Sequence, residues 1–123
     1  MLTLLTAPKD KWCRRAVEFL DANGIKYANR DIIEDHPTID ELRKWMEMSG
    51  LSAFAFLHSG GFRLSALAIG ERLAMLNEES RLAYIAATGK IVRRPILVGE
   101  SFVLVGFDDI VWARKLNTIK SEQ

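Results

Sequence analysis

The sequence predicts an α/β fold in which a four-stranded mixed sheet carries an inserted helical segment. Short apolar runs lie near both ends of the chain, and amphipathic segments lie between and after them. The first two runs are separated by a crossover of helical length, which is typical of a parallel strand pair. The last two runs are joined by Gly99-Glu100-Ser101 only. A connection this short is typical of an antiparallel hairpin.

The first part of the chain predicts a strand, a helix and a strand. Leu2–Thr6 is apolar without a helical period, as expected for a strand buried on both faces. Asp10 is a good N-cap for the helix that follows, and Asn23-Gly24 is a typical stop signal. Residues 25–33 alternate loosely and predict a second strand. The inner side of the helix is expected to hold Trp12, Ala16, Phe19 and Leu20.

The middle of the chain predicts helices. Thr38 and Glu41 are spaced as a capping box, and Ser49-Gly50 ends the helix that they begin. Residues 51–76 are apolar but interrupted by glycines, so we expect short helical pieces and turns. Residues 78–88 predict a further helix.

Two apolar runs and a helix close the chain. Pro95–Val98 and Phe102–Val105 predict the hairpin. The last helix is expected to begin at Asp108-Asp109 and to end near Arg114-Lys115, because these charges suit the helix dipole. Residues 117–123 are mostly polar and are expected to fray.

The order of these elements predicts one domain, which covers residues 1–123. A length of 123 residues suits a single core and is too short for two ordinary domains. Residues 1–33 and 90–117 are expected to form the sheet-bearing core, and residues 34–89 the helical insertion. Exposed apolar residues around 51–57 make a contact surface plausible.

The composition limits the classes of function. A net charge of +1 offers no field that would recruit nucleic acid or an acidic membrane. A single cysteine excludes an intramolecular disulfide and fits a reducing compartment. With no apolar run long enough to span a bilayer, we expect a cytoplasmic protein. One cysteine and two distant histidines provide no zinc spacing, and no phosphate-binding glycine loop is present, so no metal or bound cofactor is expected.

The stretch Ala7–Ala16 concentrates the chemistry of the chain. If Asp10 caps the helix, Cys13 occupies its third position, near the positive end of the helix dipole. That position favours the thiolate, as do the neighbouring cations, whereas the Asp10 carboxylate opposes it. The cations are Lys9, Lys11, Arg14 and Arg15.

Residues 4–16 resemble the amino-terminal motif of the ArsC/Spx family, glutaredoxin-related proteins with a thioredoxin-like fold. In that motif a turn with Pro-x-Cys-x-x-Cys leads into the first helix. Pro8 matches the motif proline, Cys13 the second cysteine and Asp10 the first. The first cysteine is the nucleophile of the family's arsenate reductases, so the resemblance implies that Asp10 replaces this nucleophile.

Two further matches extend the resemblance over most of the chain. Residues 91–98 contain Arg94-Pro95, which resembles the family's Arg-Pro step before the third strand. The resemblance implies that Pro95 is cis and faces the loop, and that Arg94 helps to hold an oxyanion there, with Arg14 as a second candidate. Residues 104–107 resemble the Val-Gly-Phe that ends the fourth strand. The resemblance therefore also predicts a thioredoxin-like fold.

Each candidate residue also has a structural interpretation. Asp10 is either a helix cap or a partner that tunes the reactivity of Cys13. Cys13 is either a small buried hydrophobe or a nucleophile. Arg94 binds an oxyanion or pairs with Asp10, and Arg93 either joins it or lies on an edge. By the resemblance, His58 falls in the region where the family's reductases carry another oxyanion-binding arginine, but we expect it to be a lone surface residue. His36 is expected to be a turn residue, and Trp12, Trp45 and Trp112 are expected to be packing residues.

Three functions are compatible with these residues. The first is an ArsC-family protein without the reductase nucleophile, acting as a binding or regulatory module with a protein partner. The second is a monothiol oxidoreductase resembling arsenate reductases, in which Cys13 attacks and glutathione is the co-substrate, with a small thiol or oxyanion as ligand. The third is an Spx-like transcription regulator that binds RNA polymerase, without direct nucleic-acid contact. Whether the protein is an enzyme stays open at this point.

Overall fold

The computed structural model describes residues 2–58 and 71–122, and its centre is a four-stranded mixed sheet. The strand order is β2-β1-β3-β4, with β1 and β2 parallel and the other two pairings antiparallel. This confirms the expected thioredoxin-like α/β fold, including the hairpin. The strands are β1 (Leu2–Thr6), β2 (Tyr27–Asp31), β3 (Ile96–Val98) and β4 (Val103–Val105).

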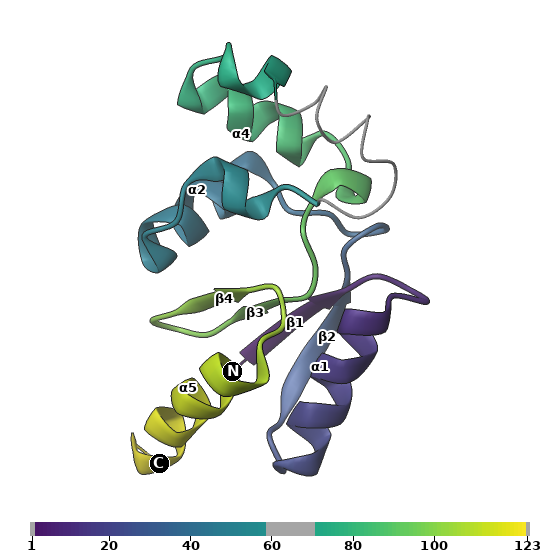
Figure 1. Cartoon of the computed structure of the whole chain (residues 1–123), viewed down its shortest axis with the longest axis vertical. Helices are drawn as coiled ribbons and strands as arrows, with labels where there is room; N and C mark the ends of the chain where they lie inside the picture. The colour runs from purple at the N-terminus through teal and green to yellow at the C-terminus, as the bar shows by residue number, and fades with distance from the viewer. Residues whose placement is uncertain (1, 59–70, 123) are drawn as a thin grey trace.

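Helices cover both faces of the sheet (Figure 1). One face carries α1 (Lys11–Ala22) and α5 (Asp109–Glu122). On the other face α2 (Ile39–Ser49) lies next to the sheet, and α4 (Glu78–Ala86) packs on α2. Two short 3₁₀ helices, η1 (Ala53–Phe56) and η2 (Gly89–Ile91), both contact α4. None of the helices in the described ranges is both long enough and apolar enough to cross a membrane.

Strand β1 separates two hydrophobic cores. Its residues Leu4 and Leu5 are both fully buried, but successive side chains of a strand point to opposite faces. Leu4 packs with Leu20 of α1 and Trp112 of α5, and Leu5 packs in the core that contains Trp45 of α2. This explains why the strand is apolar without alternation.

Local capping decides where the helices begin and end. Asp10 accepts a hydrogen bond from the backbone of Cys13, and Thr38 and Glu41 form the expected capping box. Gly50 ends α2 with a φ of 72°, in the left-handed region that glycine tolerates. These three predictions are confirmed.

Three sequence-based expectations are wrong. Trp12 is 48% exposed rather than on the inner side of α1. Helix α5 continues to Glu122, where we expected an end near Lys115 and a frayed tail. Strand β2 is confined to Tyr27–Asp31. The glycine breaks expected at residues 60, 61 and 70 lie outside the described residues.

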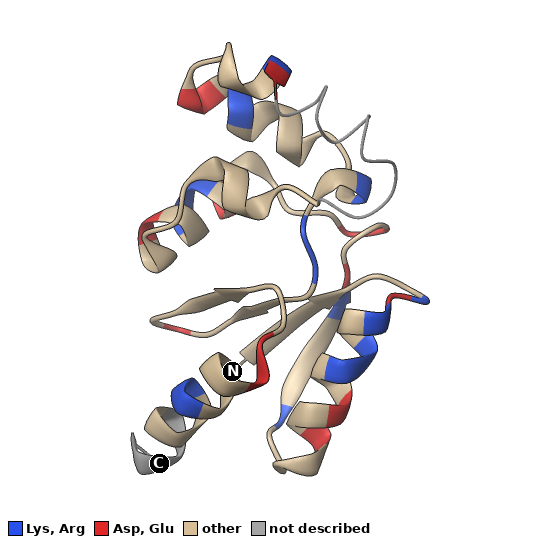
Figure 2. Ribbon diagram, viewed as in Figure 1, with Lys and Arg blue, Asp and Glu red and all other residues tan. Residues whose placement is uncertain are grey.

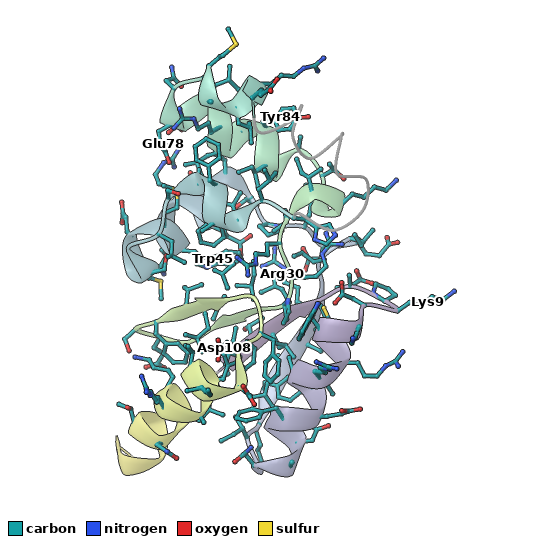
Figure 3. The ribbon with its side chains drawn as sticks, in the orientation of Figure 1. Lys9, Arg30, Trp45, Glu78, Tyr84 and Asp108 are labelled. Carbon is teal, nitrogen blue, oxygen red and sulfur yellow. The ribbon has the colours of Figure 1, made fainter. Side chains whose placement is uncertain are left out.

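Arg30 joins the sheet to the helical layer above it (Figure 3). From β2 its guanidinium donates two hydrogen bonds to the Glu41 carboxylate, with N–O distances of 2.6 and 2.9 Å. Its Nε donates to the carbonyl oxygen of Asp35 at 2.8 Å. Glu41 also accepts from the backbone N–H of Thr38, so one carboxylate caps α2 and fixes it to the edge strand. Sequence analysis did not single out Arg30.

Gly89 is required by a close backbone approach. A Cβ atom at this position would lie 1.8 Å from the carbonyl oxygen of Ile32. That oxygen belongs to backbone, so it has no room to move aside. The contact places η2 directly against the chain that leaves β2.

We expect Gly89→Ala to lower the free energy of unfolding by about 2 kcal/mol or more, because the added methyl overlaps backbone. Gly99→Ala is the matched control, because the added methyl would meet the Phe102 side chain, which can shift. Urea denaturation of both variants measures the difference. Equal losses would contradict the role assigned to the Gly89 contact.

The Arg30 guanidinium holds the pKa of the Glu41 carboxyl below its ordinary value of 4.5. A carboxyl with a lowered pKa stabilises the folded state fully above the unfolded-state pKa. That contribution is lost as the pH falls through the folded-state value. We therefore expect the unfolding free energy of the wild type to fall below pH 4.5 more steeply than that of Glu41→Gln. Denaturation series at several pH values would show parallel curves if the pair contributes nothing.

Candidate functional site

The candidate site lies where the loop between β1 and α1 faces two other segments. His58 and the stretch 91–94 come together because the backbone N–H of His58 donates to Ile91 and that of Arg93 donates to Phe56. The charges of Asp10 and Arg94 both affect the pKa of His58. The loop that contains Asp10, the stretch 91–94 and His58 therefore lie close together. The peptide bond between Arg94 and Pro95 is cis, the geometry that the resemblance implies.

Asp10 is the N-cap of α1. Its Oδ1 accepts from the backbone N–H of Cys13 at 3.0 Å, and its own carbonyl accepts from Arg14 N–H at 3.1 Å. The preceding residue, Lys9, has a positive φ of 63°. The loop thus turns sharply and delivers a carboxylate to the helix end, where the dipole favours negative charge.

Cys13 is buried beneath this loop. Its side chain is 3% exposed, and its Sγ accepts a hydrogen bond from the backbone N–H of Ala7 at 3.4 Å. The pKa of the thiol is raised to about 12, mainly by burial and in addition by the charge of Asp10, against the lowering effects of Ala7 N–H and Arg94. Burial therefore outweighs the helix position and the neighbouring cations, which we expected to favour the thiolate. Lys9, Lys11, Arg14 and Arg15 are all exposed.

Arg94 is half-buried and bound to backbone rather than to Asp10. Its Nη2 donates to the carbonyl oxygens of Gly89, Lys90 and Val92 at 2.6, 3.0 and 2.7 Å, and its Nε donates to Val92 at 3.0 Å. Burial lowers the pKa of the guanidinium, and the negative charge of Asp10 opposes this. The internal ion pair with Asp10 that we considered is absent from the described part of the chain. Nη1 donates no hydrogen bond to a described residue.

The other predicted arginines lie at the margin of the site. Arg14 is exposed on α1, so its part in anion binding stays a prediction. Arg93 packs along Gly106, where its Nη2 would lie 2.7 Å from an added Cβ. The positive φ of Gly106, 76°, and this contact both favour glycine at the end of β4.

His58 is part of the site, which sequence analysis did not expect. It is half-buried, and burial lowers its pKa, as does the charge of Arg94, against the effect of Asp10. These effects favour the neutral form of its imidazole. The backbone pairing of residues 56–58 with 91–93 brings it there. His36 directly follows the turn at residues 32–35, where we expected it to be a turn residue, and its Nδ1 lies 3.3 Å from the carbonyl oxygen of Pro37.

The remaining tryptophans have structural roles. Trp45 and Trp112 are buried, as expected, and the indole Nε1–H of Trp112 donates to the carbonyl oxygen of Gly106 at 3.0 Å. Among the residues that the structure describes, no group of three metal-binding side chains comes together. The site therefore offers a carboxylate, a guanidinium and a neutral imidazole around a buried thiol.

The fold and the cis-proline beside a capped loop define a thioredoxin-like protein of the glutaredoxin type. The family model for glutaredoxin matches residues 2–54. Among solved structures, an ArsC-family-related protein from Bacteroides fragilis is 37% identical, with a TM-score of 0.86 over 92% of this chain and 95% of that one. A protein from Streptococcus mutans described as a possible arsenate reductase is 32% identical, with a TM-score of 0.77 over 87% and 91% of the two chains.

Curated relatives point to the same group. The uncharacterised protein YusI of Bacillus subtilis is 31% identical over 88% of this chain and 92% of its own length. The global transcriptional regulator Spx of Staphylococcus haemolyticus is 28% identical over 89% of this chain and 82% of its own. The chain belongs to the ArsC/Spx family.

The burial of the Cys13 thiol leads to a prediction about its rate of alkylation. Native Cys13 should react with iodoacetamide at pH 8 at least about a hundredfold more slowly than in the urea-unfolded chain, whose thiol has an ordinary pKa near 9.0. Asp10→Asn keeps a cap oxygen but removes the charge that raises the thiol pKa, so it should speed the native reaction. Mass spectrometry of the alkylated fraction over time measures both. A native rate close to the unfolded rate would contradict the assigned burial.

Proposed function

We propose that this member of the ArsC/Spx family lacks the reductase nucleophile and acts as a binding or regulatory module for a protein partner. The observation that supports this most directly is the state of Cys13. It is the only cysteine of the chain, it is buried, and its pKa is raised to about 12. A thiol in this state supplies almost no thiolate at neutral pH, and the thiolate is the nucleophile.

The carboxylate at position 10 does not replace a thiolate. In the proposed alignment with the family motif, Asp10 stands where the arsenate reductases carry their attacking cysteine. A reductase must transfer two electrons from sulfur to the oxyanion and end with an S–S bond, which a carboxylate cannot form. With one cysteine in the chain, no internal disulfide can form either.

Similarity to Spx proteins supports a regulatory role for this module. The relatives named as global transcriptional regulators match 89% of this chain. By this proposal RNA polymerase is the first partner to test, through protein contacts rather than contacts with DNA. A redox switch that needs a cysteine pair is not available to a chain with one cysteine.

Turnover assays test the proposal. Wild type and Cys13→Ser should both lack arsenate reduction and reduction of a glutathione mixed disulfide. Asp10→Cys should acquire measurable thiol chemistry, because it places a thiol in the exposed loop at the helix start. Its helix start should weaken by about 1 kcal/mol, so thermal melts must accompany the assays.

The outcomes separate the alternatives. Wild-type turnover that is lost in Cys13→Ser would overturn the proposal and assign a monothiol oxidoreductase activity to Cys13. A folded Asp10→Cys variant without thiol reactivity would show that the loop no longer supports the chemistry at all, and this also agrees with a non-catalytic module.

A further inference from the structure

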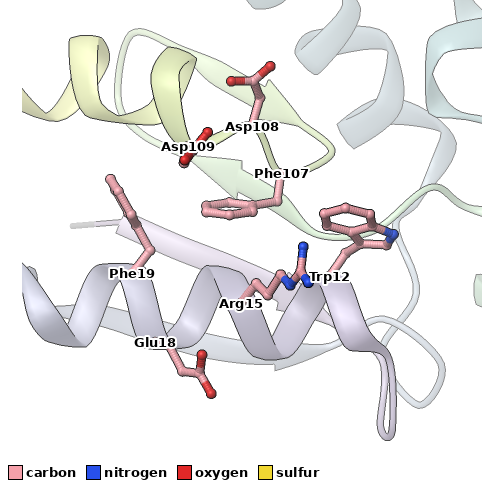
Figure 4. A pocket seen from close by; sticks show the side chains of 7 residues that line it. All are labelled: Trp12, Arg15, Glu18, Phe19, Phe107, Asp108 and Asp109. Carbon is pink, nitrogen blue, oxygen red and sulfur yellow. The ribbon is translucent and has the colours of Figure 1, made fainter.

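A groove separates α1 from the turn that joins β4 to α5 (Figure 4). Its volume is about 560 Å³, and it lies on the face of the sheet opposite α2 and α4. Aromatic rings from both elements form its walls, and charged side chains stand around them. The lining residues are Trp12, Arg15, Glu18, Phe19, Phe107, Asp108 and Asp109.

Trp12 is the unusual member of this lining. The other two tryptophans are buried in the cores, whereas Trp12 is 48% exposed at the first turn of α1. Its ring holds cations already, because the guanidinium carbon of Arg15 lies 4.8 Å and the Nζ of Lys11 lies 5.6 Å from the ring centroid. The Arg15 contact shows that the geometry of the groove suits a guanidinium over an aromatic face.

The groove has an excess of negative charge. Among the described residues that line it, Arg15 is the one cation, against the three carboxylates of Glu18, Asp108 and Asp109, and Lys11 adds a second positive charge beside Trp12. Asp108 and Asp109 use Oδ1 to accept from Ile110 N–H at 3.0 and 2.9 Å, which caps α5. Their Oδ2 atoms accept no hydrogen bond from a described residue. These oxygens can accept hydrogen bonds from a basic side chain of a ligand.

Two exposed apolar side chains follow the groove residues along the chain. Ile110 is 63% exposed and Val111 is 47% exposed, and both follow directly after the two aspartates. A small cation would leave these side chains uncovered, whereas a polypeptide can contact them and the groove together. Exposed aromatic and aliphatic side chains beside charged ones are typical of protein interfaces.

We propose that this groove docks a segment of a partner protein that places an arginine or lysine over Trp12 and apolar side chains against Ile110 and Val111. The inference rests on the proposed function, because it assigns a binding surface to the module. The partner's cation competes with Arg15 and Lys11 for the Trp12 ring. Arg15 lies nearer to the ring and is part of the groove lining, so it is the internal cation that the partner displaces.

Binding of a defined probe tests the groove. The probe is a short capped peptide of alternating leucine and arginine, and its control has citrulline in place of arginine. ¹⁵N-labelled protein is titrated with each, and the indole N–H signal of Trp12 is followed. We expect saturable shifts of Trp12 and of the first turn of α5 with the arginine peptide, and affinity at least about fivefold weaker for citrulline.

Variants matched in charge distinguish the groove from a general field. Glu18→Gln with Asp109→Asn should weaken arginine-peptide binding about fivefold, and Glu47→Gln with Glu71→Gln, on other exposed surfaces, should not. Arg15→Gln should tighten binding more than Arg14→Gln, because both remove one positive charge but only Arg15 covers the Trp12 ring.

Several results would overturn the inference. These are no saturable binding, equal affinity for the citrulline peptide, shifts confined to residues outside the groove, or equal effects of the Arg15 and Arg14 substitutions. Sedimentation that shows a dimer with Trp12 buried would assign the groove to a second copy of the chain instead. Failure here leaves the Cys13 assays unaffected, so it is distinguishable from failure of the proposed function.

Discussion

The hydrogen bond from the backbone N–H of Cys13 to the Asp10 carboxylate links the start of α1 to the chemistry of the loop. An uncapped first turn would leave backbone donors without partners, so the carboxylate stabilises the helix. The same bond fixes Cys13 at a position where α1 packs on the sheet and its thiol is excluded from water. Because burial disfavours the thiolate more than the neighbouring positive charge favours it, the helix start removes the reactivity that its dipole would otherwise promote.

The opposite side of the site is held by backbone contacts. Arg94 donates to the carbonyl oxygens of Gly89, Lys90 and Val92 and so folds this stretch around its own guanidinium. Gly89 in turn lies against the carbonyl of Ile32, and Arg30 fixes the helical layer to β2 through Glu41. The site therefore has a rigid frame, although its side chains neutralise one another in part. Such a frame positions a surface for recognition as well as it positions a nucleophile.

The groove and the loop are adjacent but differ in what they expose. Cys13 points into the protein, whereas Trp12, one residue earlier, is exposed to solvent. Charged side chains are distributed over the ribbon without one dominant sign, so the acidic groove is a local feature (Figure 2). This arrangement explains how a chain with a net charge of +1 can present a surface that favours a cation. Long-range attraction contributes little, and selectivity depends on short-range contacts.

Local sequence signals determined the strands, the helix starts and the family. Buried strands need continuous apolar runs, and the caps at Asp10, Thr38 and Gly50 act within one helical turn, so neighbouring residues suffice to predict them. The end of α5 beyond Lys115 was not predictable from its charges, because charges near a helix end favour a stop but do not impose one.

Tertiary structure alone decided the environments of the site. The state of Cys13 depends on burial against the sheet, and the position of His58 depends on backbone pairing between distant segments. Trp12 is exposed although its spacing matches the inner side of α1, because at the first turn the facing wall is the rim of a groove rather than a core. Periodicity tells which residues share a face of a helix. What that face contacts is decided by elements far away in the chain.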